Sequence, residues 1–104
     1  MTERPLILIA DDESKIRRLL AAAIENAGYD TASADDGEAA LKVFDSLTPA
    51  PDLVILDIMM PVLDGFEVLD ALRKRSSVPV ILLSARSRTP QTKSVRFSTV
   101  RTIT

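Results

Sequence analysis

The sequence contains no cysteine and no histidine among its 104 residues. Without cysteine the chain cannot form disulfide bonds or use a thiolate nucleophile, and this absence fits a reducing compartment. Without histidine it lacks the commonest zinc ligand, the Ser-His and Cys-His catalytic pairs, and the commonest general base. Chemistries that depend on a thiolate or on histidine are therefore excluded.

Long apolar runs are also missing. None approaches the roughly 20 residues that a membrane-spanning helix needs, and residues 1–5 do not have the pattern of a signal peptide. We therefore expect a soluble, cytoplasmic protein without a membrane partner. A chain of 104 residues allows one small domain with a single core.

The small net charge of −2 conceals an uneven distribution. Residues 1–84 hold all fifteen acidic residues and eight basic ones, whereas residues 85–104 hold five basic residues and no acid. This break in composition predicts that the C-terminal segment differs in origin or role from the rest.

Three short apolar runs predict buried strands: Leu6–Ala10, Leu53–Leu56 and Val78–Leu83, the last interrupted by Pro79. Runs without alternation are typical of strands that are covered on both faces, as in a parallel sheet. A weaker segment at Tyr29–Ala34 predicts an edge strand.

Helical periodicity separates these strands. One helix is predicted between a cap at Ser14 and a stop at Gly28, a second from Asp36 to about Leu47, and a third that begins at Asp64 with a capping-box pattern. Alternating strands and helices predict an α/β domain with right-handed crossovers and helices on both faces of the sheet.

Acidic side chains follow two of the predicted strands. Asp11 and Asp12 come directly after the first strand, and Asp57 ends the third. In open α/β sheets ligands bind beyond the carboxyl ends of the strands, where the strand order reverses, so the three carboxylates are expected to converge there. Either protonation of one carboxyl or a hard divalent cation would relieve their repulsion.

Mg²⁺ bound by proteins usually keeps several waters and is shared with a phosphate group. A magnesium site at this cluster would therefore indicate that the protein binds or transfers a phosphoryl group. Asp57 is the candidate nucleophile for an aspartyl-phosphate, Asp11 and Asp12 are candidate metal ligands, and Ser84, after the fourth strand, could donate to a phosphoryl oxygen. Each residue alone has a simpler interpretation: Asp12 as a helix cap, and Ser84 as a turn residue. The combination favours the site.

At these residues the chain resembles the receiver domain of two-component response regulators, in the subfamily that normally carries a winged-helix DNA-binding domain. The matching stretches are "ILIADDE", "LVILDIMMPVLDGFEVL" and "VPVILLSAR", and the similarity runs from about Leu6 to Arg86. The resemblance implies a flavodoxin-like (CheY-like) doubly wound parallel sheet.

The resemblance also implies roles for individual residues. Asp57 would accept a phosphoryl group from a histidine of a partner sensor kinase. Asp12, Asp57 and the backbone carbonyl of Met59 would ligate Mg²⁺ with support from Asp11, and Ser84 would be the switch hydroxyl. The domain would act in signal transduction as a phosphoprotein, not as an enzyme.

The sequence departs from the family after residue 86. The family continues with a fourth helix, a fifth strand ending in a Lys-Pro pair that supplies the phosphoryl-binding lysine, and a fifth helix. Lys93 comes too early and lacks the proline, so it is not assigned this role. We expect a receiver domain over residues 1–86, incomplete at the C-terminus through truncation or a shifted reading frame, and a basic tail outside the family over residues 87–104, with no DNA-binding domain.

Loss of these elements has structural consequences. The fourth strand is expected to become an exposed edge, and the sheet face over Leu6–Ala10 and Leu53–Leu56 to lie partly open, which favours self-association or a homodimer. Alternatively, a tail strand around Ser94–Thr99 takes the place of the fifth strand.

Three other functions correspond to parts of this sequence. A haloacid-dehalogenase-type phosphatase needs an aspartate two residues after the nucleophile, where this chain has Met59. The basic tail could bind nucleic acid through its charge, but its sequence contains no recognisable nucleic-acid-binding motif. A receiver remnant that only binds proteins, through a face of the first helix with Ile16 and Leu19, shares every feature up to Arg86 and remains the alternative.

Overall fold

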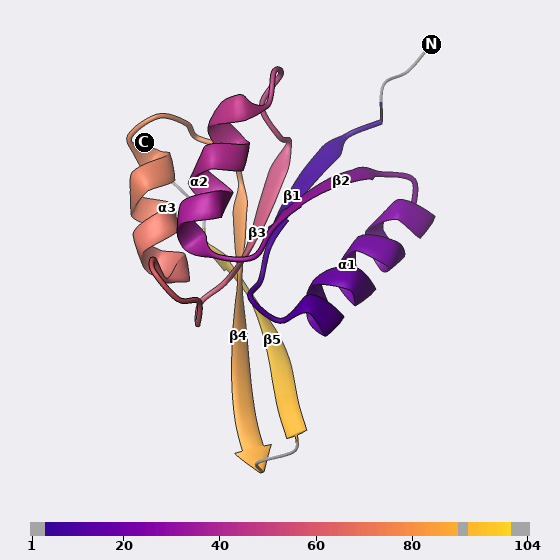
Figure 1. Cartoon of the computed structure of the whole chain (residues 1–104). Helices are drawn as coiled ribbons and strands as arrows, with labels where there is room; N and C mark the ends of the chain where they lie inside the picture. Colours follow the sequence, from indigo (N-terminus) through magenta and orange to yellow (C-terminus); the bar gives the residue numbers. More distant parts are fainter. Residues whose placement is uncertain (1–3, 90–91, 101–104) are drawn as a thin grey trace.

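The computed structural model describes residues 4–89 and 92–100, with side chains up to Leu83. Strands and helices alternate from the N-terminus, and the described part ends in a β-hairpin (Figure 1). The elements are β1 (Leu6–Ala10), α1 (Ser14–Asn26), β2 (Asp30–Ala34), α2 (Gly37–Ser46), β3 (Leu53–Asp57), α3 (Gly65–Arg73), β4 (Val80–Thr89) and β5 (Thr92–Val100).

The strands form one sheet in the order β2-β1-β3-β4-β5. β1 pairs in parallel with both β2 and β3, and β3 pairs in parallel with β4. The chain therefore winds outward in both directions from the β1–β3 pair, which is the doubly wound arrangement expected from the sequence. The point where the winding reverses lies between β1 and β3.

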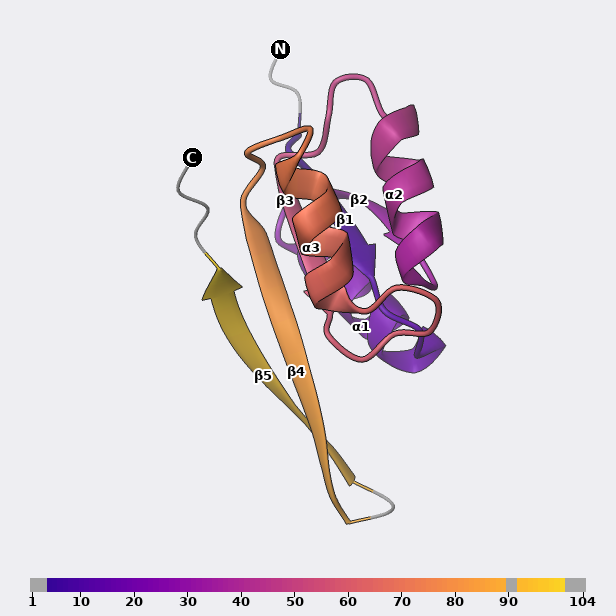
Figure 2. The ribbon, with the colours of Figure 1, turned by 90° about the vertical axis from the view of Figure 1, so that its left-hand side faces the viewer.

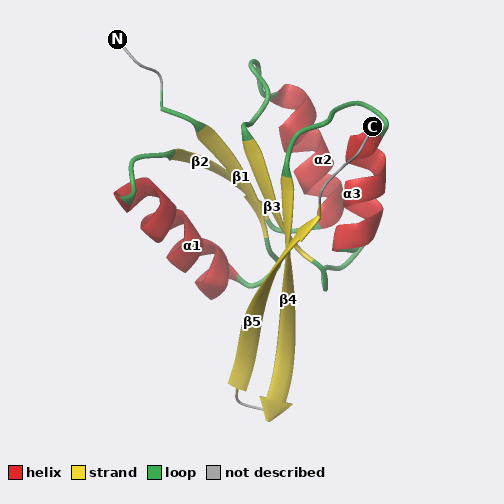
Figure 3. Ribbon diagram, turned by 180° about the vertical axis from the view of Figure 1, so that it is seen from behind, coloured by secondary structure: helices red, strands yellow, loops and turns green. Residues whose placement is uncertain are grey.

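Helices cover both faces of this sheet. α2 and α3 pack side by side on one face and α1 packs on the other (Figure 3). The larger core lies under α2 and α3 and includes Leu8, Leu56, Val68 and Leu82. These strands are rich in branched residues because they are covered on both sides.

The smaller core, under α1, corrects one expectation. Ile7, Ile9 and Ile55 are buried there, because Leu20 and Ile24 of α1 pack over them. The prediction that this face of β1 and β3 lies partly open is therefore wrong at these positions.

Two helices begin with side-chain caps, of which the sequence predicts the one at Asp64. The Asp36 carboxylate accepts a hydrogen bond from Ala39 N at 2.7 Å at the start of α2. At α3 the capping box is complete: Asp64 accepts from Glu67 N at 2.8 Å, and Glu67 accepts from Asp64 N at 2.9 Å.

The first helix departs from its predicted cap. α1 starts at Ser14 and its N-cap is Glu13, with no side-chain cap bond, so the assignment of Ser14 as the cap is wrong. The carboxylate of Asp11 instead accepts a hydrogen bond from Glu13 N at 2.8 Å. The predicted stop is correct, because Gly28 adopts a φ of 106°, which only glycine tolerates easily.

The C-terminal hairpin corrects a second expectation. β5 pairs antiparallel with β4 from Val80↔Val100 to Thr89↔Thr92, so β4 is not an edge of the sheet. The other possibility, a tail strand around residues 94–99, is the one that the structure adopts. Residues 84–89 pair with β5 alone, because the β3–β4 ladder ends at Asp57↔Leu83, and the ribbon projects beyond the sheet (Figure 2).

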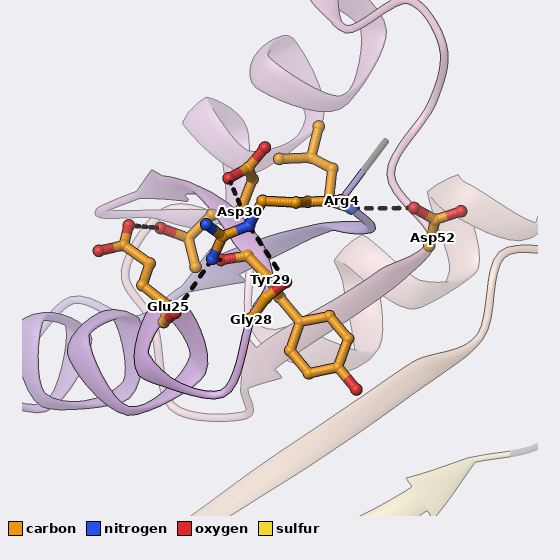
Figure 4. Close-up of polar contacts among 8 residues, drawn as sticks. Arg4, Glu25, Gly28, Tyr29, Asp30 and Asp52 are labelled. Atoms are coloured by element: carbon orange, nitrogen blue, oxygen red, sulfur yellow. Dashed lines mark hydrogen bonds and ion pairs between the residues drawn. The ribbon is translucent and has the colours of Figure 1, made fainter. Parts of the chain in front are cut away.

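A polar network ties the amino ends of the strands together (Figure 4). Arg4 donates to three backbone carbonyls at 3.1 Å and lies 3.4 Å from the Asp30 carboxylate; the carbonyls belong to Glu25, Gly28 and Tyr29. The Asp52 carboxylate accepts from Leu6 N at 2.9 Å, which joins the start of β1 to the residue before β3.

Candidate functional site

Three carboxylates meet at the opposite, carboxyl edge of the sheet. Asp11, Asp12 and Asp57 each place a carboxylate oxygen within 4.8 Å of the others. Asp11 is only 2% exposed and Asp57 only 1%, whereas Asp12 is exposed. The residues that the sequence predicts to converge therefore do so.

The strand register explains this convergence. Ala10 of β1 is the register partner of Leu56 of β3, so Asp11 and Asp57 follow at the same level on neighbouring strands. Because β1 and β3 are the strands between which the winding reverses, no crossover covers the crevice beyond them. The acidic cluster lies at the place where ligands bind in sheets of this kind.

Backbone N–H groups orient both buried carboxylates. Asp57 accepts from Met59 N at 3.2 Å and Asp11 accepts from Glu13 N at 2.8 Å, in each case two residues further along the chain. These short turns hold carboxylate oxygens at the strand ends. Three like charges so close together favour a hard cation with oxygen ligands, and the donor set fits Mg²⁺.

The loop after Asp57 packs closely against the strand it leaves. Gly65 N donates to the Ile58 carbonyl at 2.9 Å, and a Cβ atom on Gly65 would lie 2.7 Å from the Asp57 carbonyl oxygen. Val62 in the same loop has a φ of 72°, a left-handed conformation that a β-branched residue rarely adopts. The sequence pattern predicts only that a helix begins here, at Asp64.

A basic residue that the sequence analysis did not assign lies beside the cluster. Arg17 of α1 is half-buried, and its Nη1 donates to the backbone carbonyl of Asp11 at 2.7 Å. No spacing rule marks it, because the contact depends on how the turn between β1 and α1 folds back.

The remaining predicted site residues are placed only through their backbone. Leu83 is the register partner of Asp57, so Ser84 follows one residue beyond that level on the neighbouring strand. Its hydroxyl lies outside the described side chains, and its switch role stays a prediction. The role of the Met59 carbonyl as a metal ligand also stays a prediction.

A cavity of about 530 Å³ lies at the amino edge of the sheet, far from the acidic cluster. Its charged residues, Arg4, Asp30 and Asp52, are engaged with the backbone or with one another. The acidic edge, not this cavity, is therefore the candidate site.

The doubly wound sheet with an acidic cluster at its carboxyl edge is typical of one protein family. The profile of the response regulator receiver domain matches residues 7–99, and the chain belongs to that family. The division into a receiver domain up to residue 86 and a separate tail stays a prediction.

Curated relatives of the chain are named as transcriptional regulators. It is 49% identical over 85 residues to a probable transcriptional regulator, ycf27, of Porphyridium aerugineum, covering 82% of this chain and 35% of that protein. It is 46% identical over 81 residues to the alkaline phosphatase synthesis transcriptional regulatory protein PhoP of Bacillus subtilis (strain 168), covering 77% and 33%. The chain spans about a third of the length of the relatives it matches.

Solved structures agree with the fold. The receiver domain of Francisella response regulator 1452 superposes with a TM-score of 0.74 at 40% identity, covering 83% of this chain and 70% of that one. The chemotaxis protein CheY4 of Vibrio cholerae gives a TM-score of 0.75 at 30% identity, covering 86% and 74%.

The chain is thus a receiver domain of two-component signal transduction, a class whose members accept phosphoryl groups and are not enzymes in the ordinary sense. Receiver domains bind Mg²⁺ at their acidic pocket, and this chain has the acidic cluster. No helix in residues 4–89 and 92–100 is long and apolar enough to cross a membrane.

Proposed function

We propose that Asp57 accepts a phosphoryl group from the phosphohistidine of a sensor kinase, with Mg²⁺ bound beside it. The observation that carries this proposal is the meeting of Asp11, Asp12 and Asp57 within 4.8 Å at the point where the winding reverses. Asp11 and Asp12 would hold the cation together with Asp57 and the Met59 carbonyl. The bound cation would offset the negative charge of the incoming phosphoryl group.

The chain's own residues perform the transfer. A carboxylate oxygen of Asp57 attacks phosphorus, the new O–P bond forms, and the bond to the donor nitrogen breaks with its electrons leaving on the imidazole. Asp57 suits this role because a backbone N–H at 3.2 Å orients its carboxylate and its burial limits access of water. Ser84 would donate its hydroxyl to the bound phosphoryl group.

The partner supplies the histidine, since this chain contains none. Response regulators of this class act in the cytoplasm, where we place the protein. The matched relatives carry about two thirds of their length outside the aligned part.

A direct test is the intact mass of the protein after incubation with Mg²⁺ and acetyl phosphate. We expect one added phosphoryl group, and none in the Asp57→Asn variant. Asp52→Asn is the matched control, because Asp52 lies at the amino edge of the sheet and only bonds a backbone amide; it should be phosphorylated like the original chain. A folded protein without an adduct would refute the proposal.

The second candidate is an interaction module that binds a partner without being phosphorylated. One observation favours it: Leu19 on α1 is 69% exposed, although it belongs to the apolar stripe of that helix, and Ile16 beside it is only half-buried. The same surface could serve a kinase, so the two candidates differ in the adduct on Asp57 and not in binding. Self-association is a further outcome of such a surface; sedimentation would detect it.

A further inference from the structure

Arg17 stands beside the acidic cluster and has no role in the proposed phosphoryl transfer. Its guanidinium reaches back from the first turn of α1 and donates to the Asp11 carbonyl at 2.7 Å. Its own N–H donates to the Glu13 carbonyl at 2.9 Å. One residue therefore bonds both sides of the turn that carries Asp12.

The same turn is fixed at two further points. Asp11 N donates to the Ala34 carbonyl of β2 at 3.2 Å, and the Asp11 carboxylate accepts from Glu13 N at 2.8 Å. The Arg17 contact is the one among them that comes from a side chain of the helix. It is a hydrogen bond from a charged donor, which is shorter and stronger than a neutral one.

We propose that Arg17 is a positioning residue for the metal site, and that its bond to the Asp11 carbonyl sets the turn geometry on which Mg²⁺ affinity depends. This inference rests on the proposed function. Mg²⁺ demands near-octahedral geometry, so a small shift of Asp11 or Asp12 is costly. When a residue that orients a metal ligand without touching the metal is mutated, the metal affinity typically falls about 10–100-fold.

The charge of Arg17 acts in the opposite direction. A cation beside three carboxylates repels Mg²⁺, so removal of the charge alone would raise the affinity. The sign of the change therefore separates positioning from simple electrostatics. A purely structural role would lower stability without a specific effect on the metal.

The test is calorimetric titration of the whole chain with MgCl₂. Arg17→Met keeps most of the aliphatic stem and removes the donors; we expect about a tenfold loss of affinity. Arg17→Lys restores a charged donor and should recover most of the loss. Arg18→Met is the matched control, since Arg18 is exposed and bonds only Ser14 O of its own helix.

Each outcome is decisive. If the original chain binds no Mg²⁺, the proposed metal site fails and the inference with it. If the original chain binds Mg²⁺ but Arg17→Met binds equally well or more tightly, the inference alone is overturned. If Arg17→Met does not fold, Arg17→Ala takes its place, because it also removes the donors: a tenfold loss of Mg²⁺ affinity supports positioning, and unchanged or tighter binding overturns it.

Discussion

Gly65 lies against the backbone of Asp57: a Cβ atom on Gly65 would come within 2.7 Å of the Asp57 carbonyl oxygen. The first residue of α3 thus packs directly on the residue proposed to carry the phosphoryl group. The helix can start there only because that position has no side chain.

Gly65→Ala should therefore destabilise the fold. We expect a loss of about 1–3 kcal/mol in the free energy of unfolding, the usual cost of overpacking, measured by urea denaturation followed by far-UV circular dichroism. The variant should also be phosphorylated more slowly, because α3 or Asp57 must shift. Phe66→Ala, at an exposed neighbouring position, is the control; an equal loss there would show that the backbone contact is not the cause.

Without Mg²⁺, the Asp12→Asn variant should be more stable than the original chain. With Mg²⁺, it should be less stable than the original chain. Without the cation we expect a gain of at most about 1 kcal/mol, because one of three neighbouring like charges is removed. With Mg²⁺ the variant should gain less stability than the original chain, which at a free concentration 100 times Kd gains about 2.7 kcal/mol.

Urea midpoints at matched ionic strength measure both effects of Asp12→Asn. Asp35→Asn is the control, since Asp35 is also exposed and follows β2 at the same edge of the sheet. If both variants respond to Mg²⁺ in the same way, the cation acts on general surface charge and not on the cluster.

Val62→Gly should stabilise the protein. The left-handed φ of 72° at Val62 destabilises the folded state by roughly 1–2 kcal/mol for a branched residue. Glycine removes this strain, but its greater conformational freedom in the unfolded chain cancels part of the gain in stability. We expect a net gain of about 0.5–1 kcal/mol, measured as a shift of the unfolding midpoint. Val62→Ala keeps the Cβ atom and should give no such gain; a similar gain from alanine would contradict the conformational explanation.

Asp64→Ala should weaken the start of α3, because it removes the carboxylate that accepts from Glu67 N at 2.8 Å. Loss of an N-cap costs about 0.5–2 kcal/mol. Thermal unfolding would measure it beside Asp70→Ala, an exposed acid in the same helix, which should change stability by less than about 0.5 kcal/mol. Equal losses would mean that the capping box does not stabilise the helix.

The pairing of β5 with β4 predicts slow hydrogen exchange in residues 92–100. Amides that bond across a ladder exchange through local opening. Mass spectrometry of peptides from this segment should show protection, reduced by Ser98→Pro, because proline is disfavoured inside a strand and Ser98 lies within the β4–β5 ladder as the register partner of Leu82. Complete exchange within the shortest labelling time would contradict the strand.

Most of the fold was predictable because local patterns carry it. The runs that became β1 and β3 are unbroken and branched, and the caps at Asp36 and Asp64 are local interactions between residues three apart. The acidic cluster was also predictable, since parallel strands bring their carboxyl ends to one edge. Such inferences need only spacing and the rules of sheet topology.

The errors share a different cause. The local pattern predicts a cap at Ser14 because spacing alone does not show that Asp11 accepts the N–H of Glu13. β4 was expected to be an edge because its pairing with β5 depends on a hairpin that no family pattern predicts. The Gly65 packing and the Arg17 contact were missed for the same reason, since both depend on how backbone segments approach in three dimensions.

The composition of β5 has a consequence for assembly. The sheet ends on that side in a strand with two cationic residues, Lys93 and Arg96, and four hydroxyl-bearing ones. Charged and polar residues at a border strand oppose the addition of a further strand, because their cations repel a second copy and must lose water. β5 thus pairs with the backbone of the apolar Val80–Leu83 stretch, so that in the described sheet this side of β4 is not open to a further strand.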